Sequence, residues 1–145
     1  MGPKRVHEVM TDRPRCVTPE TPVAEAARLM ETDDVGALPI LEGENLTGMV
    51  TDRDIVIRAV AKGKDPRGMP VREVASEELV TVHPDDELAE ALRLMAHHQV
   101  RRLPVVDEGR LVGIVAQADI ASEANEKAVG AMVEDISRAP TGPRV

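Results

Sequence analysis

The sequence contains no phenylalanine, tyrosine or tryptophan, and its net charge of −8 comes without any basic cluster. The missing aromatic rings exclude a site that stacks nucleic-acid bases on side chains, and the negative charge argues against nucleic acid as a partner. A core must be built from Val, Leu, Ile, Met and Ala. Any planar ligand would therefore be held by aliphatic side chains and backbone groups. With 42% hydrophobic and 30% charged residues, the 145-residue chain has the balance of a globular protein.

Cysteine and long apolar runs are equally scarce. Cys16 is the only cysteine, which excludes an intrachain disulfide and agrees with a reducing compartment. We interpret it as a small hydrophobic residue of an extended segment rather than a reactive thiol. No apolar run approaches the roughly 20 residues that span a bilayer, and residues 1–14 lack the apolar stretch of a secretory signal. We therefore expect a cytoplasmic location and no membrane partner.

An internal repeat organises the sequence. Residues 6–55 align on residues 71–120 without a gap, with 19 identities in 50 positions. The matches include "AEA" and "RLM" at helical spacing, two Leu-Pro pairs, and a glycine and an aspartate six residues apart. Agreement of this extent indicates a duplication, so the same elements are expected in both copies.

Each copy predicts the order strand, helix, strand, strand, helix. The first extended run, 16–18 or 81–83, ends at a proline. In the following helix, Thr21 is expected as N-cap with Pro22 at the first helical position, and Asp86 takes the capping place in the second copy. Two short runs of branched residues then flank a turn and predict a hairpin, before a final helix. The fold class is α/β in the mixed (α+β) sense.

The repeat also sets the expected domain boundaries. We assign the first unit to residues 6–61, a linker to 62–70, the second unit with a C-terminal helix to 71–136, and a flexible tail to 137–145. A unit of about 55 residues is marginal alone. We therefore expect the two units to pack by their sheets about a pseudo-two-fold axis and to share one core, which leaves two equivalent clefts between them.

One motif recurs where the last strand meets the last helix. It reads Gly48-Met49-Val50-Thr51-Asp52-Arg53-Asp54 in the first copy, and in the second copy the glycine and aspartate return while Ala116 replaces the threonine. Together with the Leu-Pro pairs, this pattern resembles a tandem pair of CBS (cystathionine-β-synthase) domains over residues 6 to about 124. The resemblance implies two β-α-β-β-α repeats in a stand-alone regulatory module that needs no cofactor.

The resemblance also implies an adenosine-type ligand, AMP, ADP, ATP or S-adenosylmethionine, in the clefts. Asp54 would accept hydrogen bonds from both ribose hydroxyls, Thr51 would offer its hydroxyl beside a helix N-terminus, and Gly48 would allow close approach of the backbone. A capping box explains Thr51 and Asp54 equally well without a ligand. In the second copy Asp119 is present but the hydroxyl is missing, so Asp119 is either a ligand contact or an acidic residue in the first turn of the helix.

Further ligand contacts are implied by position. The base-binding edge and pocket would be lined by Val17, Thr18, Val82, His83, Ala37, Leu38, Pro39, Arg102, Leu103 and Pro104. Arg101 and Arg102 are the candidate phosphate ligands, or else they form surface salt bridges. Since Gly36 and Ala37 carry no charge at the equivalent positions, the two clefts should bind with unequal affinity.

No chemistry beyond binding is indicated. Adjacent His97 and His98 diverge by about 100° on a helix, so no metal site is predicted. Met30 and Met95 are expected in the core. The leading hypothesis is an energy or metabolite sensor that forms a homodimer, with residues 120–136 adding to the contact, and that acts on an unidentified protein target. The alternative is a ligand-free structural or interaction dimer, and an enzyme is not favoured.

Overall fold

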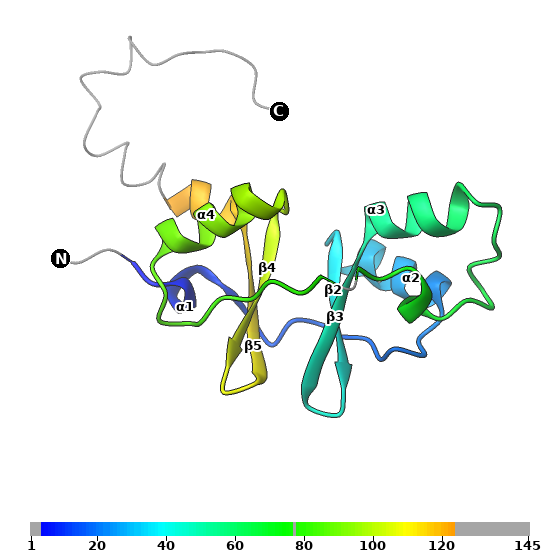
Figure 1. Ribbon diagram of the computed structural model, residues 1–145, viewed down its shortest axis with the longest axis horizontal. Coiled ribbons are helices and arrows are strands. Elements are labelled where there is room, and N and C mark those ends of the chain that lie inside the picture. The colour runs from blue at the N-terminus through cyan, green and yellow to red at the C-terminus, as the bar shows by residue number, and fades with distance from the viewer. Residues whose placement is uncertain (1–3, 77, 124–145) are drawn as a thin grey trace, which may run out of the picture.

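The computed structural model describes residues 4–76 and 78–123, and it consists of two similar halves (Figure 1). The first half contains α2 (Val23–Asp33), β2 (Ala37–Glu42), β3 (Asn45–Thr51), α3 (Asp52–Ile55) and the π-helical turn η1 (Val56–Val60). The second half contains α4 (Leu88–His98), β4 (Arg102–Asp107), β5 (Arg110–Ala116) and a helical segment, 117–123. The expected tail and the continuation of the last helix to 136 lie outside the described residues.

The two predicted hairpins are confirmed, and their registers are equivalent. Ala37 lies opposite Thr51 in the first hairpin, and Arg102 lies opposite Ala116 in the second. Both loops have two residues with a glycine at positive φ, Gly43 and Gly109. The hairpins join into one antiparallel sheet through a single residue pair close to their turns. The repeat in the sequence is therefore a repeat in the structure.

The first strand that we predicted in each copy is reduced to a single residue pair. Val17 bridges Ile40 and Val82 bridges Val105, both in parallel orientation. Each bridge has two backbone hydrogen bonds, such as Val17 N–H to Pro39 O at 2.9 Å and Leu41 N–H to Val17 O at 2.8 Å. The chain turns at Thr18 immediately afterwards, so the ladder cannot extend.

Each predicted helix start was wrong by one residue. Helix α2 begins at Val23 with Pro22 at the N-cap, and α4 begins at Leu88 with Glu87 at the N-cap. The Thr21 hydroxyl instead accepts the Thr18 N–H at 3.0 Å, and Asp86 makes the corresponding bond in the second copy. These side chains close the turn before the helix rather than the helix itself. Among the described residues, no helix is long and apolar enough to cross a membrane.

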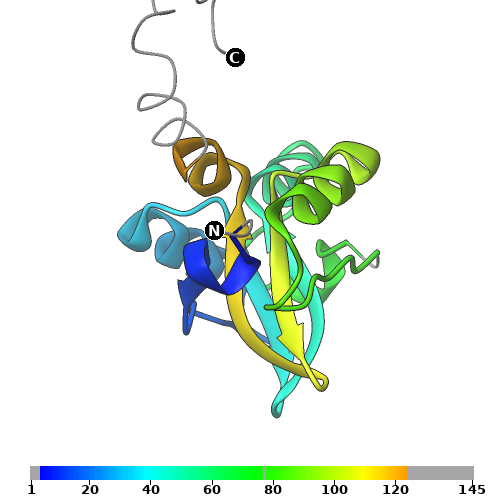
Figure 2. The same cartoon turned by 90° about the vertical axis from the view of Figure 1, so that its left-hand side faces the viewer.

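The first segment of each repeat packs on the opposite half of the molecule. Helix α1 (Val6–Val9) lies in the second half, whereas the 3-10 turn η2 (Val71–Glu73) lies in the first (Figures 1 and 2). The backbone contacts are equivalent, because Val6 N–H donates to Asp86 O and Val71 N–H donates to Thr21 O, both at 2.8 Å. The two repeats thus exchange their first segments, because each segment packs on the half formed by the other repeat.

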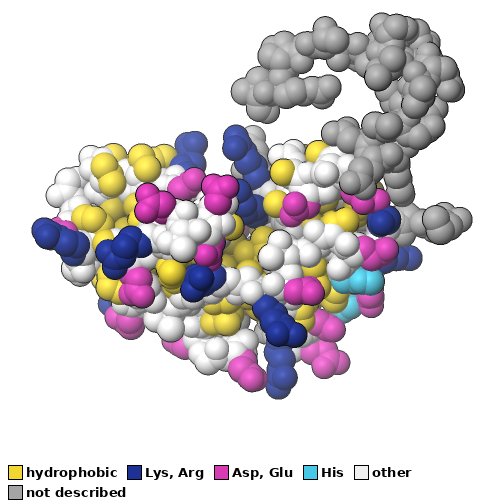
Figure 3. Space-filling model, turned by 180° about the vertical axis from the view of Figure 1, so that it is seen from behind, with side chains coloured by type: hydrophobic (Ala, Val, Ile, Leu, Met, Phe, Trp, Pro, Cys, Tyr) yellow, Lys and Arg dark blue, Asp and Glu magenta, His cyan; other side chains and the backbone are white. Residues whose placement is uncertain are grey.

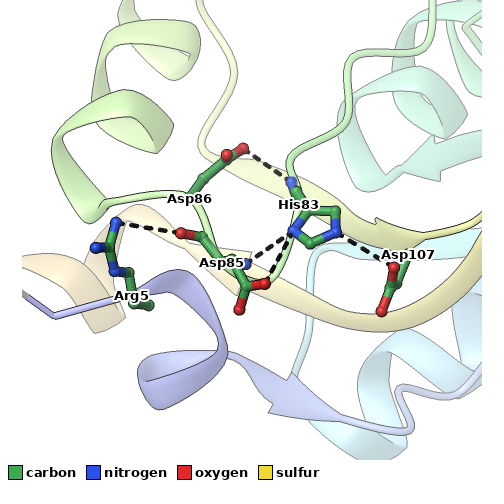
Figure 4. A network of polar contacts seen from close by, with 5 residues as sticks. All are labelled: Arg5, His83, Asp85, Asp86 and Asp107. Atoms are coloured by element: carbon green, nitrogen blue, oxygen red, sulfur yellow. Dashed lines mark hydrogen bonds and ion pairs between the residues drawn. The ribbon is translucent and has the colours of Figure 1, made fainter.

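Polar contacts add to the hold on α1 (Figure 4). Arg5 Nη1 donates to Asp85 O at 3.3 Å and pairs with Glu87 at 3.6 Å. In the same loop the His83 backbone N–H donates to Asp86 Oδ2 at 2.9 Å, and His83 Nδ1 accepts the Asp85 N–H at 3.0 Å. These hydrogen bonds fix the conformation of the loop at residues 83–86, against which α1 packs.

The expected single shared core is not what the structure shows. One buried cluster takes Met69 from the linker and Val71 and Val74 from the second repeat into the core of the first half. A separate cluster takes Val6 into the core of the second half. Met30 and Met95 are buried in these two clusters, as predicted. The halves are thus joined by exchanged segments that complete two separate cores. In each half the apolar side chains are covered by the first segment of the other repeat, and not by that of their own repeat.

The short strand β1 (Thr11–Asp12) continues this exchange. It pairs with β5 at Ile114 and Gly113, and a Cβ on Gly113 would lie 2.7 Å from the Met10 sulfur and 2.8 Å from the Thr11 carbonyl oxygen. A Cβ on Gly48 would meet nothing closer than 3.7 Å. A side chain at position 113 would therefore collide with the exchanged segment, whereas the role expected of Gly48 toward a ligand stays a prediction.

Candidate ligand-binding clefts

A cavity of 600 Å³, which we call cleft 1, lies between the two halves and is lined by both repeats. The first repeat supplies Thr51 and Asp54 at the start of α3, and the second supplies Arg101 and Arg102 at the start of β4. Its apolar wall includes Ala37, Met49, Leu79, Val80, Val100, Leu103 and Pro104. The opposite face, seen in Figure 3, is also hollowed between the two halves, with hydrophobic side chains inside and charged ones around the hollow.

Thr51 and Asp54 form a capping box at the mouth of cleft 1. The Thr51 N–H donates to Asp54 Oδ2 and the Asp54 N–H donates to Thr51 Oγ1, each at 3.0 Å. Both residues are partly exposed and line the cavity. The structural role that the sequence suggested is therefore present, and the remaining acceptor positions of the carboxylate are available to a ligand in the cleft.

The two arginines of cleft 1 differ in position. Arg101 is exposed, whereas Arg102 is half-buried beside Gly36. A Cβ on Gly36 would lie 3.2 Å from Arg102 Nη1 and 3.1 Å from Asp52 Oδ2. A side chain at position 36 would thus crowd both groups, so the glycine leaves room for the guanidinium at the cleft.

A second cavity of 490 Å³, cleft 2, has Asp119 and Ala116 where cleft 1 has Asp54 and Thr51. Two arginines, Arg13 and Arg15, line it from the first repeat. Arg15 donates to both carboxylate oxygens of Asp33, and this hydrogen bonding lowers the pKa of the Asp33 carboxyl. The two clefts are related by the repeat, yet their polar groups differ.

The predicted ligand residues divide into three groups. Cleft 1 gathers Ala37, Thr51, Asp54, Arg101, Arg102, Leu103 and Pro104. Cleft 2 gathers Ala37, Leu38, Arg102 and Asp119. The lining of neither cavity includes Val17, Thr18, Pro39, Gly48, Val82 or His83. The ring of His83 instead meets Asp107 Oδ1 at 3.2 Å through Nε2 (Figure 4).

Sequence reasoning missed one stretch of each cleft. Thr11, Pro14 and Arg15 line cleft 2, and the equivalent Ser76, Leu79 and Val80 line cleft 1. They follow the exchanged first segments and cross from one half to the other. Their equivalence in the repeat was the available signal, but the exchange that brings them to the clefts is not visible in the sequence.

Cys16 lies outside both cavities and is only partly exposed. Its Sγ donates to Pro14 O at 3.2 Å, and burial raises the pKa of the thiol. Because the thiolate is the reactive form, we expect iodoacetamide at pH 7.5 to alkylate the folded protein at least about fivefold more slowly than the urea-unfolded chain. Mass spectrometry of timed samples measures both rates, and equal rates would contradict the inert role.

Metal binding was not predicted from the sequence. Within residues 4–76 and 78–123, no group of three or more His, Cys, Asp or Glu side chains is arranged to hold a metal ion. His98 lies at cleft 1, where its Nδ1 is 2.9 Å from Glu78 Oε1. His97 and His98 rings meet edge to face rather than converging on one point.

The fold and the two clefts define a protein built from a pair of related domains with a cleft on either side of their junction, and comparison with known proteins identifies the family. The CBS domain model matches residues 6–60 and 71–126, so this chain belongs to the CBS-domain family. CBS domain-containing protein YhcV of Bacillus subtilis is 45% identical over 133 residues, which cover 91% of this chain and 94% of the relative. Hypoxic response protein 1 of Mycobacterium tuberculosis is 42% identical over 130 residues, 89% of this chain and 91% of its own.

Solved structures agree with this assignment. Hypoxic Response Protein I, crystallised with two coordinated zinc ions, has a TM-score of 0.76 at 42% identity and covers 82% of this chain and 98% of its own. CBSX2 in complex with AMP has a TM-score of 0.74 at 28% identity, over 85% and 97% of the two chains. The CBS pair of protein MJ0100, in complex with 5′-methylthioadenosine and S-adenosylmethionine, has a TM-score of 0.79 at 26% identity, over 87% and 99%.

Proposed function

We propose that this protein is a regulatory module that binds an adenosine-type ligand in cleft 1 and acts as an energy or metabolite sensor. The observation that carries the proposal is the meeting of Thr51 and Asp54 from one repeat with Arg101 and Arg102 from the other. A carboxylate suits a ribose diol, and guanidinium groups suit a phosphate. The ligands of CBSX2 and of MJ0100, two related structures, support the same class of ligand.

Each part of the ligand has a proposed contact. Asp54 would accept the ribose hydroxyls while it keeps its bond to the Thr51 N–H, and the Thr51 hydroxyl would face the sugar or phosphate. The arginines would bind the phosphate. The base would lie between aliphatic side chains such as Met49 and Leu103, since the chain has no aromatic residue to stack on it. An adenine nucleotide agrees with the cytoplasmic location that the sequence predicts.

An ultraviolet spectrum of the freshly purified protein tests this proposal first. Without Phe, Tyr or Trp the chain absorbs almost nothing in the near ultraviolet, so a co-purified purine would dominate the spectrum. We expect a purine band that is released on denaturation and identified by chromatography, or, for a weaker site, saturable heat on titration with AMP. A blank spectrum together with a flat titration would contradict the proposal.

A ligand-free interaction module is the second candidate. It is favoured by the capping box, which satisfies Thr51 and Asp54 without any ligand. In either case we propose a regulatory rather than a catalytic role, with the signal passed to a protein target. The same titration separates the two candidates, because only the sensor binds AMP.

We also propose a homodimer that uses the end of the first repeat. Val56, Ile57 and Val60, all on η1, are 55%, 44% and 61% exposed. An aliphatic group exposed to this extent is typical of an interaction surface. The contribution expected of residues 120–136 stays a prediction, since most of that segment lies outside the described residues.

Val60→Glu is expected to weaken such a dimer by about 100-fold, because a carboxylate would be buried without a partner. Sedimentation velocity over a concentration series measures the shift toward monomer. Lys62→Glu is the matched control, since it adds the same carboxylate at an exposed position without removing apolar area. A dimer that survives Val60→Glu would place the interface elsewhere.

A further inference from the structure

Arg102 lines both clefts, and so does Ala37. The two residues are equivalent in the repeat, since Ala37 is the first residue of β2 and Arg102 is the first residue of β4. A pair related in this way lies on either side of the pseudo-two-fold axis, where each residue borders both cavities. Only one member of the pair carries a charge, so the two clefts share a single guanidinium at their common wall.

The side chain of Arg102 is turned toward cleft 1. Its Nη1 lies next to Gly36, whose other near neighbour is Asp52. Gly36 and Asp52 line cleft 1, whereas the lining of cleft 2 includes neither. Arg102 nevertheless also lines cleft 2, and the residue is only half-buried. A modest rotamer change would therefore present the guanidinium to the other cavity.

The charges of the two linings depend on this one residue. Cleft 1 has the arginines 53, 101 and 102 against Asp52, Asp54 and Glu78. Cleft 2 has the arginines 13, 15 and 102 against Asp33, Asp34 and Asp119. Each lining is neutral only when Arg102 is counted in it. When the guanidinium serves one cleft, the lining of the other is left with one excess negative charge, which opposes an anionic ligand.

We propose that Arg102 couples the two clefts and sets which ligands they hold together. A nucleotide phosphate in cleft 1 engages the shared guanidinium, so cleft 2 then binds a second anionic nucleotide less tightly but still accepts an uncharged nucleoside. The coupling is reciprocal, because it is a free energy between two sites. This inference rests on the proposed function and adds to it the charge of the ligand that each cleft accepts.

Calorimetric titration with AMP and with adenosine tests the coupling. Adenosine has no phosphate, so the ratio of its two stepwise affinities reports the intrinsic difference between the clefts. For the wild type we expect the AMP ratio to exceed the adenosine ratio by about tenfold, as the loss of one charge-assisted contact implies. In Arg102→Ala the two ratios should become equal. If the wild type binds only one AMP but two adenosine molecules, the second AMP affinity is too weak to measure, and this outcome also supports the coupling.

Arg101→Ala is the matched control. It removes an equivalent guanidinium that lines cleft 1 alone, so AMP should bind more weakly while the excess ratio persists. Thermal melting checks that both variants are folded. An excess that survives Arg102→Ala, or its absence in the wild type, overturns the coupling and leaves the proposed function intact. A wild-type protein that binds neither AMP nor adenosine overturns both.

Discussion

Asp54→Ala is expected to abolish nucleotide binding at cleft 1, with a loss of affinity for AMP of at least about 100-fold. The variant removes both acceptors of the ribose diol, and a hydrogen bond to a charged group contributes roughly 1.5–3 kcal/mol. Two such bonds exceed the roughly 2.8 kcal/mol that corresponds to a factor of 100. Titration calorimetry with AMP measures the change directly.

Two further variants separate recognition from capping. The capping box at Thr51 and Asp54 means that Asp54→Ala also costs about 1 kcal/mol of stability. Asp54→Asn keeps an oxygen that can accept the Thr51 N–H, but it lacks the charge and the second acceptor. It should melt close to the wild type and still bind AMP weakly. Asp119→Ala is the control, because Asp119 lines cleft 2 and not cleft 1. An affinity for AMP that is unchanged in both Asp54 variants would show that Asp54 serves only as part of the helix cap.

The second large effect concerns the exchanged segments. A fragment of residues 1–66 lacks Met69, Val71 and Val74, which complete the core of the first half, and it exposes Val6, whose core lies in the second half. At roughly 1.5–3 kcal/mol for each buried side chain, the loss approaches the 5–15 kcal/mol that stabilises a whole domain. We therefore expect no cooperative thermal transition from this fragment, measured by circular dichroism at low concentration.

Residues 11–76 form the matched control, a fragment of the same length. It contains every member of the first buried cluster, from Val17 to Val74, and it keeps the Val71 N–H to Thr21 O hydrogen bond. We expect a cooperative transition from this fragment, although a small domain of this size is marginal. Similar melts from both fragments, or a more stable 1–66, would show that the exchange does not decide stability.

The local elements followed from the sequence because their causes are local. Alternation and turn residues predicted the two hairpins, and Gly43 and Gly109 lie in their loops with positive φ. Helical spacing placed Met30 and Met95 in the core. The spacing of Thr51 and Asp54 predicted a capping box, which forms within one turn of chain. The helix starts at Val23 and Leu88 were missed because Thr21 and Asp86 had a competing local bond, the turn to Thr18 or His83.

The duplication, the family and the candidate residues on α3 and β4 were thus determined by the sequence itself. Only the tertiary structure decided which half of the molecule the first segment of each repeat packs on. The exchange packs η2 on the first half and α1 on the second, and the two halves that it joins bring Asp54 and Arg101 to one cleft. A side-chain pattern records which face of an element is apolar, but it does not record the partner that covers this face. That choice depends on how two similar halves pack against each other, and it placed Arg102 between the two clefts.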